Sequence, residues 1–284
     1  MNNRILYTPK ERKYTGKRKK TYNLWMIIGV GVCIIFVVLS VITVRLPVFQ
    51  IQKIFISGLS TVNEEDVRKE VTSALVGSYF AGLISYRFLF AVPTQTIVDA
   101  IKHKFSLIAE VHIEKEFPDT LTIGVKERTM FGILCNDAAN LEALTDKGYV
   151  DIQCAYVDTQ GVAYESAPKT HGFLIIKIST DAPMIAIGQV SVDQLMMQRI
   201  TDLNTKLPAV IGSPIVEYRL RGNVAREVRV VSNMGFSLII NRDDDLDHAL
   251  SVLGTILKKE IGSKRKNLDY IDLRFGNKVF YKFK

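Results

Sequence analysis

The sequence has few of the residues that build metal sites and disulfide scaffolds. It contains only 3 Cys and 4 His in 284 residues. So few cysteines exclude a disulfide-rich mini-protein, and 48% hydrophobic residues exclude a wholly disordered chain. The length suits one or two compact domains with packed cores.

The usual signatures of catalysis and metal binding are also missing. No His-Glu-x-x-His, Cys-x-x-Cys, Gly-x-Ser-x-Gly, phosphate loop or dinucleotide glycine pattern occurs. Asn241-x-Asp243-x-Asp245 begins like a calcium loop, but Leu246 and Val252 stand where that loop needs Gly and Glu. We interpret these acids as the start of a helix, and we expect no metal, no cofactor and no catalytic residue.

A basic domain is missing too, although the formal net charge is +8. Residues 1–23 hold eight basic residues and one acid, Glu11, which gives +7. The whole chain has 37 basic and 29 acidic residues, so the rest of the chain holds 29 basic and 28 acidic residues. Since the excess charge belongs to a tail, the sequence does not favour nucleic-acid binding.

One long apolar run is present, from Leu24 to Val44, without a charge in 21 residues. A helix of this length spans roughly 31 Å, close to the thickness of a bilayer's hydrocarbon core. A buried core helix and a cleaved signal peptide are the alternatives, but signal peptides have shorter apolar regions and an Ala-x-Ala site. We predict an uncleaved signal anchor at 24–46. The positive-inside rule then keeps the basic tail, 1–23, in the cytoplasm and places the rest outside the plasma membrane.

The first part beyond the anchor, 47–128, has the pattern of a small α+β unit. Alternating residues predict a strand over 48–57, and Asn63 followed by three acids predicts a helix start. A second helix follows Pro93, and two alternating strands flank the turn 117–120. The order is strand, helix, helix, strand, strand.

The second part, 129–284, is rich in predicted strands and has two helices. Ser191-x-x-Gln194 predicts a capping box for the first helix, and Leu246 to Leu257 have helical spacing in the second. The fold class is therefore α+β, with a β-rich C-terminal domain. The expected strands are 131–135, 154–158, 162–165, 173–178, 215–221, 225–231 and 236–240.

The last expected element is a hairpin, with 268–275 and 278–283 on either side of Gly276-Asn277. A pair with Gly first favours a type II′ turn. Val279, Tyr281 and Phe283 alternate with lysines, and lysine commonly protects a sheet edge. We expect 278–283 to be an edge strand to which a partner's strand or helix can add.

Two of the cysteines, Cys135 and Cys154, lie on the expected exported side, and Cys33 lies in the anchor. A disulfide is permitted outside the cytoplasm and would contribute about 3 kcal/mol. The sequence leaves open whether Cys135 and Cys154 form this bond or stay as free thiols.

Three stretches resemble one family. Residues 49–58 with 62–65 (Val-Asn-Glu-Glu) look like the opening of a POTRA domain, and 117–128 look like its last hairpin and exit. Tyr-Ile-Asp-Leu-Arg-Phe at 270–275 is similar to a distinctive motif near the C-terminus of the family. In this order, the stretches resemble the bacterial cell-division proteins FtsQ and DivIB.

The resemblance implies a non-enzymatic scaffold at the division septum, which binds FtsB-like and FtsL-like proteins and helps control septal peptidoglycan synthesis. It assigns partner binding to Arg274, Phe275, Val279, Tyr281 and Phe283. Other division proteins would use the POTRA-like unit, near 51–58. A POTRA-bearing secretion scaffold and an anchored cell-wall enzyme are the alternative functions.

Overall fold

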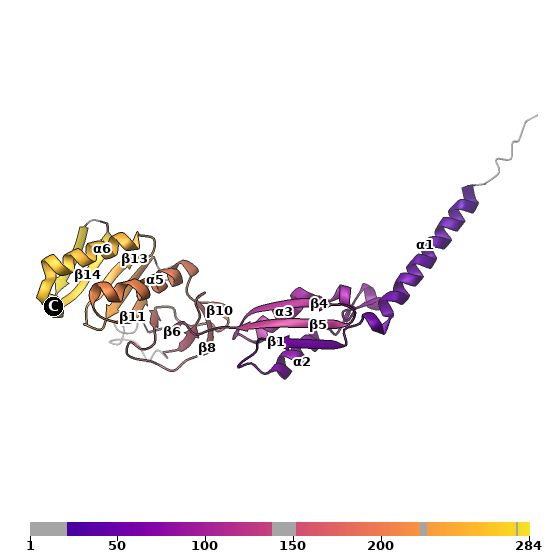
Figure 1. Cartoon of the computed structure of the whole chain (residues 1–284), viewed down its shortest axis with the longest axis horizontal. Coiled ribbons are helices and arrows are strands. Elements are labelled where there is room, and N and C mark those ends of the chain that lie inside the picture. Colours follow the sequence, from indigo (N-terminus) through magenta and orange to yellow (C-terminus); the bar gives the residue numbers. More distant parts are fainter. Residues whose placement is uncertain (1–21, 138–151, 222–225, 277) are drawn as a thin grey trace, which may run out of the picture.

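The computed structural model describes residues 22–137, 152–221, 226–276 and 278–284. Helix α1 lies at one end of the molecule, a three-stranded sheet follows it, and a ten-stranded sheet lies at the other end (Figure 1). The architecture is mixed α and β, as the sequence predicts. The first 21 residues of the basic tail lie outside the described residues.

Helix α1 (Tyr22–Arg45) contains the apolar run. Within the described part of the chain, only its segment Trp25–Thr43 is long and apolar enough to cross a membrane. None of that segment is buried in the protein, so the alternative of a buried core helix is wrong. An apolar helix left uncovered by its own protein is what a membrane span requires.

The three-stranded sheet has the order β1-β5-β4, with β1 parallel and β4 antiparallel to β5. Two helices pack on it. Between them lies a small hairpin of two short strands, which is followed by a 3₁₀ turn. The bounds are β1 (Lys53–Ser57), α2 (Glu64–Ala74), β2 (Ser78–Tyr79), β3 (Ile84–Ser85), α3 (Thr94–Lys104), β4 (Ile108–Glu116) and β5 (Thr120–Glu127).

The helices of this part form for the reasons that the sequence indicates. The Asn63 side chain accepts a hydrogen bond from the Glu65 N–H and so caps α2. The apolar residues three or four positions apart turn inward and meet the sheet. The core contains Val67, Val71, Leu75, Ile97, Ile101, Leu121, Ile123 and Val125.

The first strand is shorter than predicted. Pro47–Phe49 form a short 3₁₀ helix, and β1 begins only at Lys53. The stretch between them pairs elsewhere: Gln50 forms an isolated bridge with Phe88, and the Ile51 N–H donates to the Arg87 carbonyl at 2.8 Å. Alternation in the sequence indicates extended backbone but not the partner with which it pairs.

The ten-stranded sheet has the order β10-β8-β7-β6-β9-β11-β12-β13-β14-β15. Strand β9 is parallel to both β6 and β11, β13 is parallel to β14, and the other neighbours are antiparallel. The bounds are β6 (Gly132–Cys135), β7 (Cys154–Val157), β8 (Val162–Ser166), β9 (Lys177–Thr180), β10 (Gln189–Val190), β11 (Ile215–Leu220), β12 (Glu227–Ser232), β13 (Ser237–Asn241), β14 (Leu268–Phe275) and β15 (Lys278–Phe283).

Helices α5 (Gln194–Ile211) and α6 (Leu246–Ile256) pack together on one face of this sheet (Figure 1). Helix α6 continues as a π-helical turn, Leu257–Ile261, and a 3₁₀ helix, Gly262–Asn267. The Asp245 side chain caps α6, which confirms the interpretation of the acids before it. The core between helices and sheet includes Met196, Ile200, Leu203, Leu207, Tyr218, Val230, Leu238, Leu253 and Ile271.

Two predictions for this part are wrong in detail. Asp193, not Ser191, caps α5, because the Ser191 N–H is engaged by the Gly161 carbonyl at 2.8 Å, while Asp193 accepts from Met196. The strand expected over 173–178 begins only at Lys177 and runs to Thr180. Pairing with β6 starts there, and the preceding Leu174 side chain is almost fully exposed.

A nearly buried ion pair joins the two sheets. Arg128 follows β5, and its Nη1 lies 2.5 Å from Oδ2 of Asp158 in the loop between β7 and β8. The Arg128 Nε donates to the Ser106 carbonyl, and the Ser106 hydroxyl donates to the Tyr164 carbonyl at 2.7 Å. These bonds fix the end of the first part against the start of the second.

Candidate partner-binding hairpin and the disulfide-linked strands

Strand β15 is the edge of the ten-stranded sheet, as the sequence predicts. It pairs with β14 in an antiparallel register in which Tyr281 lies opposite Ile271 and Phe280 opposite Asp272. The expected type II′ turn includes Asn277, which lies outside the described residues. The position of the hairpin is therefore confirmed, and its turn type stays a prediction.

The outer edge of β15 offers free backbone groups. The Lys284 N–H donates inward, to the Asn267 carbonyl at 2.8 Å. Because backbone groups alternate along a strand, the N–H groups of Val279, Tyr281 and Phe283 point outward. An incoming strand could pair with these groups, as in β-strand addition.

The five sequence-predicted residues differ in their exposure. Phe275 is 53% exposed and Tyr281 is 40% exposed, whereas Val279 and Phe283 are partly buried and pack against the core. The Tyr281 and Phe283 rings meet edge to face with centroids 5.6 Å apart. Of the five sequence-predicted residues, Phe275 and Tyr281 are therefore the side chains that a partner could reach most directly.

Arg274 is held by carboxylates within the sheet. Its Nε and Nη2 donate to Oδ1 and Oδ2 of Asp272 at 2.9 and 2.6 Å, and Nη1 contacts Glu227 on β12. Burial alone would raise the pKa of Asp272, but the hydrogen bonds from Arg274 outweigh it and hold this pKa below its usual range. Both groups stay charged, and the guanidinium lies 5.7 Å from the Phe275 ring.

Phe280, which the sequence analysis did not identify, lies beside Phe275 on the hairpin. Its ring packs edge to face on Phe275 with centroids 5.2 Å apart, and it is as exposed as Phe275. Simple alternation puts Phe280 on the face away from Tyr281, and a register shift in β14 between Asp272 and Phe275 brings the two phenylalanines together. The two adjacent aromatics, Phe280 and Tyr281, are the only sequence signal for it.

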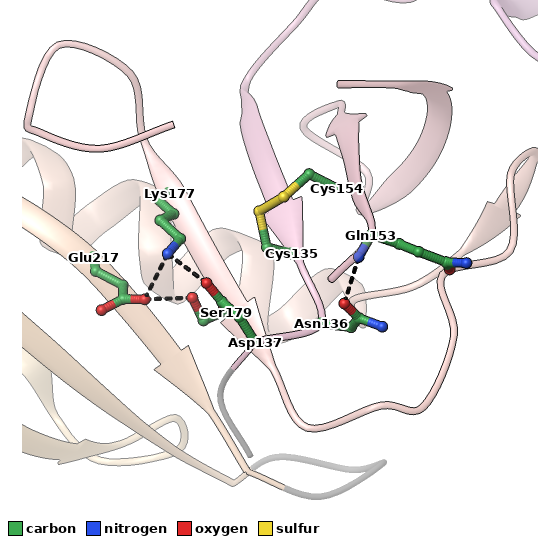
Figure 2. The surroundings of a disulfide bond; sticks show 8 residues. All are labelled: Cys135, Asn136, Asp137, Gln153, Cys154, Lys177, Ser179 and Glu217. Atoms are coloured by element: carbon green, nitrogen blue, oxygen red, sulfur yellow. Dashed lines mark hydrogen bonds and ion pairs between the residues drawn. A yellow bond between two sulfur atoms is a disulfide. The ribbon is translucent and has the colours of Figure 1, made fainter. Parts of the chain in front are cut away.

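The structure joins Cys135 and Cys154 in a disulfide, between neighbouring antiparallel strands in direct register (Figure 2). The bond lies on the face of the sheet away from α5 and α6, in a small cluster with Ile133. Next to it, the Asn136 side chain accepts from the Gln153 backbone N–H at 2.7 Å. Strands β6 and β7 are thus linked at the point where the chain leaves the described residues.

A nearly buried charge cluster lies beside the disulfide (Figure 2). Lys177 Nζ lies 2.6 Å from Oδ2 of Asp137 and 3.2 Å from Oε1 of Glu217, and Ser179 donates to Glu217. Burial opposes each of these charges, but the opposite charges and hydrogen bonds outweigh it. They lower the pKa of Asp137 and Glu217 and raise that of Lys177. This cluster ties β9, β11 and the end of β6 together as charged groups.

No group of three or more His, Cys, Asp or Glu side chains is placed to hold a metal ion in the part of the chain that the structure describes. Residues 49–128 match the family model of the POTRA domain, FtsQ-type. A comparison with curated proteins found no match.

Proposed function

We propose, from the FtsQ-type POTRA domain at residues 49–128, that this chain is a scaffold protein of bacterial cell division. The match is consistent with the FtsQ/DivIB family, whose members are non-enzymatic scaffolds, and with a role in protein–protein interactions during division. More specifically, we propose that this chain binds FtsB-like and FtsL-like proteins at the septum and helps control septal peptidoglycan synthesis. The POTRA match carries this proposal.

The domain organisation that we propose has four parts. Residues 1–23 form a cytoplasmic tail, 24–46 a signal anchor, 47–128 the POTRA domain and 129–284 the β domain. The uncovered apolar helix α1 supports a single-pass membrane protein. The eight basic residues that precede it support a cytoplasmic N-terminus and extracytoplasmic domains.

The proposed partner site is the β14–β15 hairpin. An unpaired edge with outward N–H groups supports docking by strand addition, and exposed aromatic rings beside that edge supply apolar anchors. In this proposal Phe275 and Tyr281 contact the partner. Val279 and Phe283 contribute backbone and hold the strand, and Arg274 holds the hairpin in shape. A second surface, near 51–58 with Phe55 exposed, is proposed for other division proteins.

Binding of the full chain to the organism's own FtsB-like protein tests the site. Phe275→Ala and Tyr281→Ala should each weaken binding by about 10-fold or more, as hot-spot truncations do. Phe173→Ala is the matched control, because Phe173 is 51% exposed but does not lie on the hairpin. Unfolding curves establish that each variant folds. Equal binding by all three variants would contradict the assignment, and failure of the unmodified chain to bind any division protein would contradict the function.

Tyr281→Pro separates backbone pairing from side-chain contact. It removes an outward N–H and leaves the inward bonds to β14 in place, a position where edge strands tolerate proline. Strand addition predicts weaker binding for Tyr281→Pro than for Tyr281→Ala. Equal binding would mean that only the ring is recognised.

Two further measurements address the alternatives. A fluorescent fusion concentrated at midcell would support division over secretion, and an even distribution around the membrane would contradict it. Release of fragments from purified peptidoglycan by the full chain would contradict the proposal that the protein is a non-enzymatic scaffold.

A further inference from the structure

The segment between α2 and α3, residues 76–92, is unusually apolar for a surface segment. It reads Val-Gly-Ser-Tyr-Phe-Ala-Gly-Leu-Ile-Ser-Tyr-Arg-Phe-Leu-Phe-Ala-Val, with Arg87 as its one charged residue and no acid. It includes five aromatic residues, Tyr79, Phe80, Tyr86, Phe88 and Phe90. Contiguous apolar residues on a surface mark a binding site or a membrane contact.

This segment lies against the end of the membrane helix. Strand β3 contacts α1, and Figure 1 shows the three-stranded sheet meeting α1 at this end. The backbone bridge between Gln50 and Phe88 ties the segment to the chain just after α1, and the Gln50 side chain donates to the Arg45 carbonyl. The segment therefore lies next to the C-terminal end of α1 in space.

Three aromatic rings at this end are largely exposed. Phe80 is 75% exposed, Phe90 is 67% exposed, and Phe117 in the β4–β5 turn is 70% exposed. Phe117 is held at the same end, because its ring lies 5.8 Å from that of Phe49, shortly after α1. We call Val48, Phe80, Leu83, Phe90 and Phe117 the juxtamembrane patch.

The backbone at Phe80 has an uncommon conformation. Phe80 and Ala81 both have left-handed backbone conformations, with φ of 51° and 53°, which are uncommon for residues other than glycine. They turn the chain between β2 and β3, and the core of the three-stranded sheet includes Leu89 of the same segment but leaves Phe80 exposed. Folding of the soluble part alone gives no apolar environment to this ring.

We propose that the juxtamembrane patch inserts into the lipid surface next to α1. Two observations favour lipid as the occupant. The patch lies beside the end of the apolar helix, and segment 76–92, which supplies three of its five residues, is aromatic and aliphatic with a single cation and no acid, like a membrane interface. Arg87 can reach lipid phosphates while its stem stays along the apolar surface. The inference rests on α1 spanning the membrane, which is part of the proposed function, but on no division partner.

The single tryptophan of the chain allows a direct test. Trp25 lies in α1, so Trp25→Phe removes the native signal and leaves a background for new tryptophans. The full chain is reconstituted into phosphatidylethanolamine–phosphatidylglycerol vesicles whose acyl chains are brominated near the headgroup, which quenches tryptophan only on contact. Phe80→Trp and Phe90→Trp report on the patch. Phe173→Trp, an exposed aromatic of the ten-stranded part, is the control.

The proposal predicts that Phe80→Trp and Phe90→Trp are quenched about as strongly as Trp25 in the unmodified chain, with blue-shifted emission, and that Phe173→Trp is not quenched. If Trp25 is quenched but both patch tryptophans behave like Phe173→Trp, the proposal is overturned and the patch is left to a protein partner. If Trp25 is not quenched either, the membrane anchor itself fails. Because the vesicles contain no division partner, neither outcome depends on partner binding.

Discussion

Arg274 and Asp272, two residues apart on β14, form a two-bond pair in which a half-buried guanidinium satisfies both oxygens of a buried carboxylate. The pair extends to Glu227 on β12, two strands away. The motif that suggests partner binding for Arg274 therefore has an internal structural role as well. A binding defect in an Arg274 variant is informative only when its stability is measured beside it.

Arg274→Ala should lower the free energy of unfolding by about 1–3 kcal/mol, because it leaves the Asp272 carboxylate buried without its partner. Denaturant unfolding measures this change. Lys282→Ala is the control on the same hairpin: its pair with Asp269 is exposed and 3.7 Å long, so its loss should cost at most about 0.5 kcal/mol. Equal losses for both variants would show that Asp272 does not depend on Arg274.

The disulfide should form in an oxidising environment and stabilise the protein. Replacing both Cys135 and Cys154 with Ala should cost about 3 kcal/mol, since the bond closes a loop between residues 19 apart in the sequence. Mass spectrometry after alkylation without reduction should find both sulfurs unmodified by the alkylating agent. Two alkylated thiols in native protein would refute the bond, and an unchanged unfolding energy would refute its contribution.

Glu127 should make the POTRA part sensitive to acid. Its carboxylate accepts from the backbone N–H groups of Ser60, Thr61 and Val62 at 2.9 Å each. Desolvation raises its pKa, but these hydrogen bonds outweigh it, so the folded pKa lies below the usual 4.5. The stabilisation is therefore present above about pH 4.5 and is lost as the pH falls through the folded pKa.

Glu127→Gln keeps an acceptor oxygen but loses the charge, so it should be about 1 kcal/mol less stable than the unmodified chain at pH 7. The difference should shrink as the pH falls below about 4.5, where the carboxyl takes up a proton first in the unfolded chain and, at lower pH, in the folded chain. Unfolding measured between pH 7 and pH 3 checks this prediction. A difference that stays constant over this range would show that the charge of Glu127 does not matter.

The Arg128–Asp158 pair should fix the POTRA part against the ten-stranded part. Arg128→Ala leaves the Asp158 charge nearly buried and unpaired and should cost about 3 kcal/mol or more. It should also speed proteolysis at the junction. Lys126→Ala is a matched control two residues away, because its pair with Glu110 is 2.9 Å long but largely exposed, which predicts a loss below about 1 kcal/mol. Equal behaviour of the two variants would mean that the junction does not depend on Arg128.

Much of the fold could be predicted from local patterns. Asn63 before three acids and Val67 with Val71 specify α2, because capping and helical spacing involve only nearby residues. What the sequence could not predict depends on distant contacts. The bridge from Gln50 to Phe88 shortens β1, and the bond from Ser191 to Gly161 moves the cap of α5 to Asp193.

The position of the candidate hairpin at a sheet edge was predicted, but not the arrangement of its side chains. The alternation of lysines and apolar residues indicates an edge strand, and β15 is one. Which aromatic side chains of the hairpin meet depends on the register shift in β14, and no local pattern reveals that shift. Phe280 was therefore not identified from the sequence. Segment 76–92 was not interpreted because it has neither a helical nor a strand period.

The position of β15 also limits what can reach it. Helix α1 and the hairpin lie at opposite ends of the molecule, with the whole length of both sheets between them (Figure 1). A partner anchored in the same membrane cannot touch this edge with residues that directly follow its own span. It needs a stalk as long as the two sheets together, and shortening that stalk should abolish the contact even when both binding surfaces are intact.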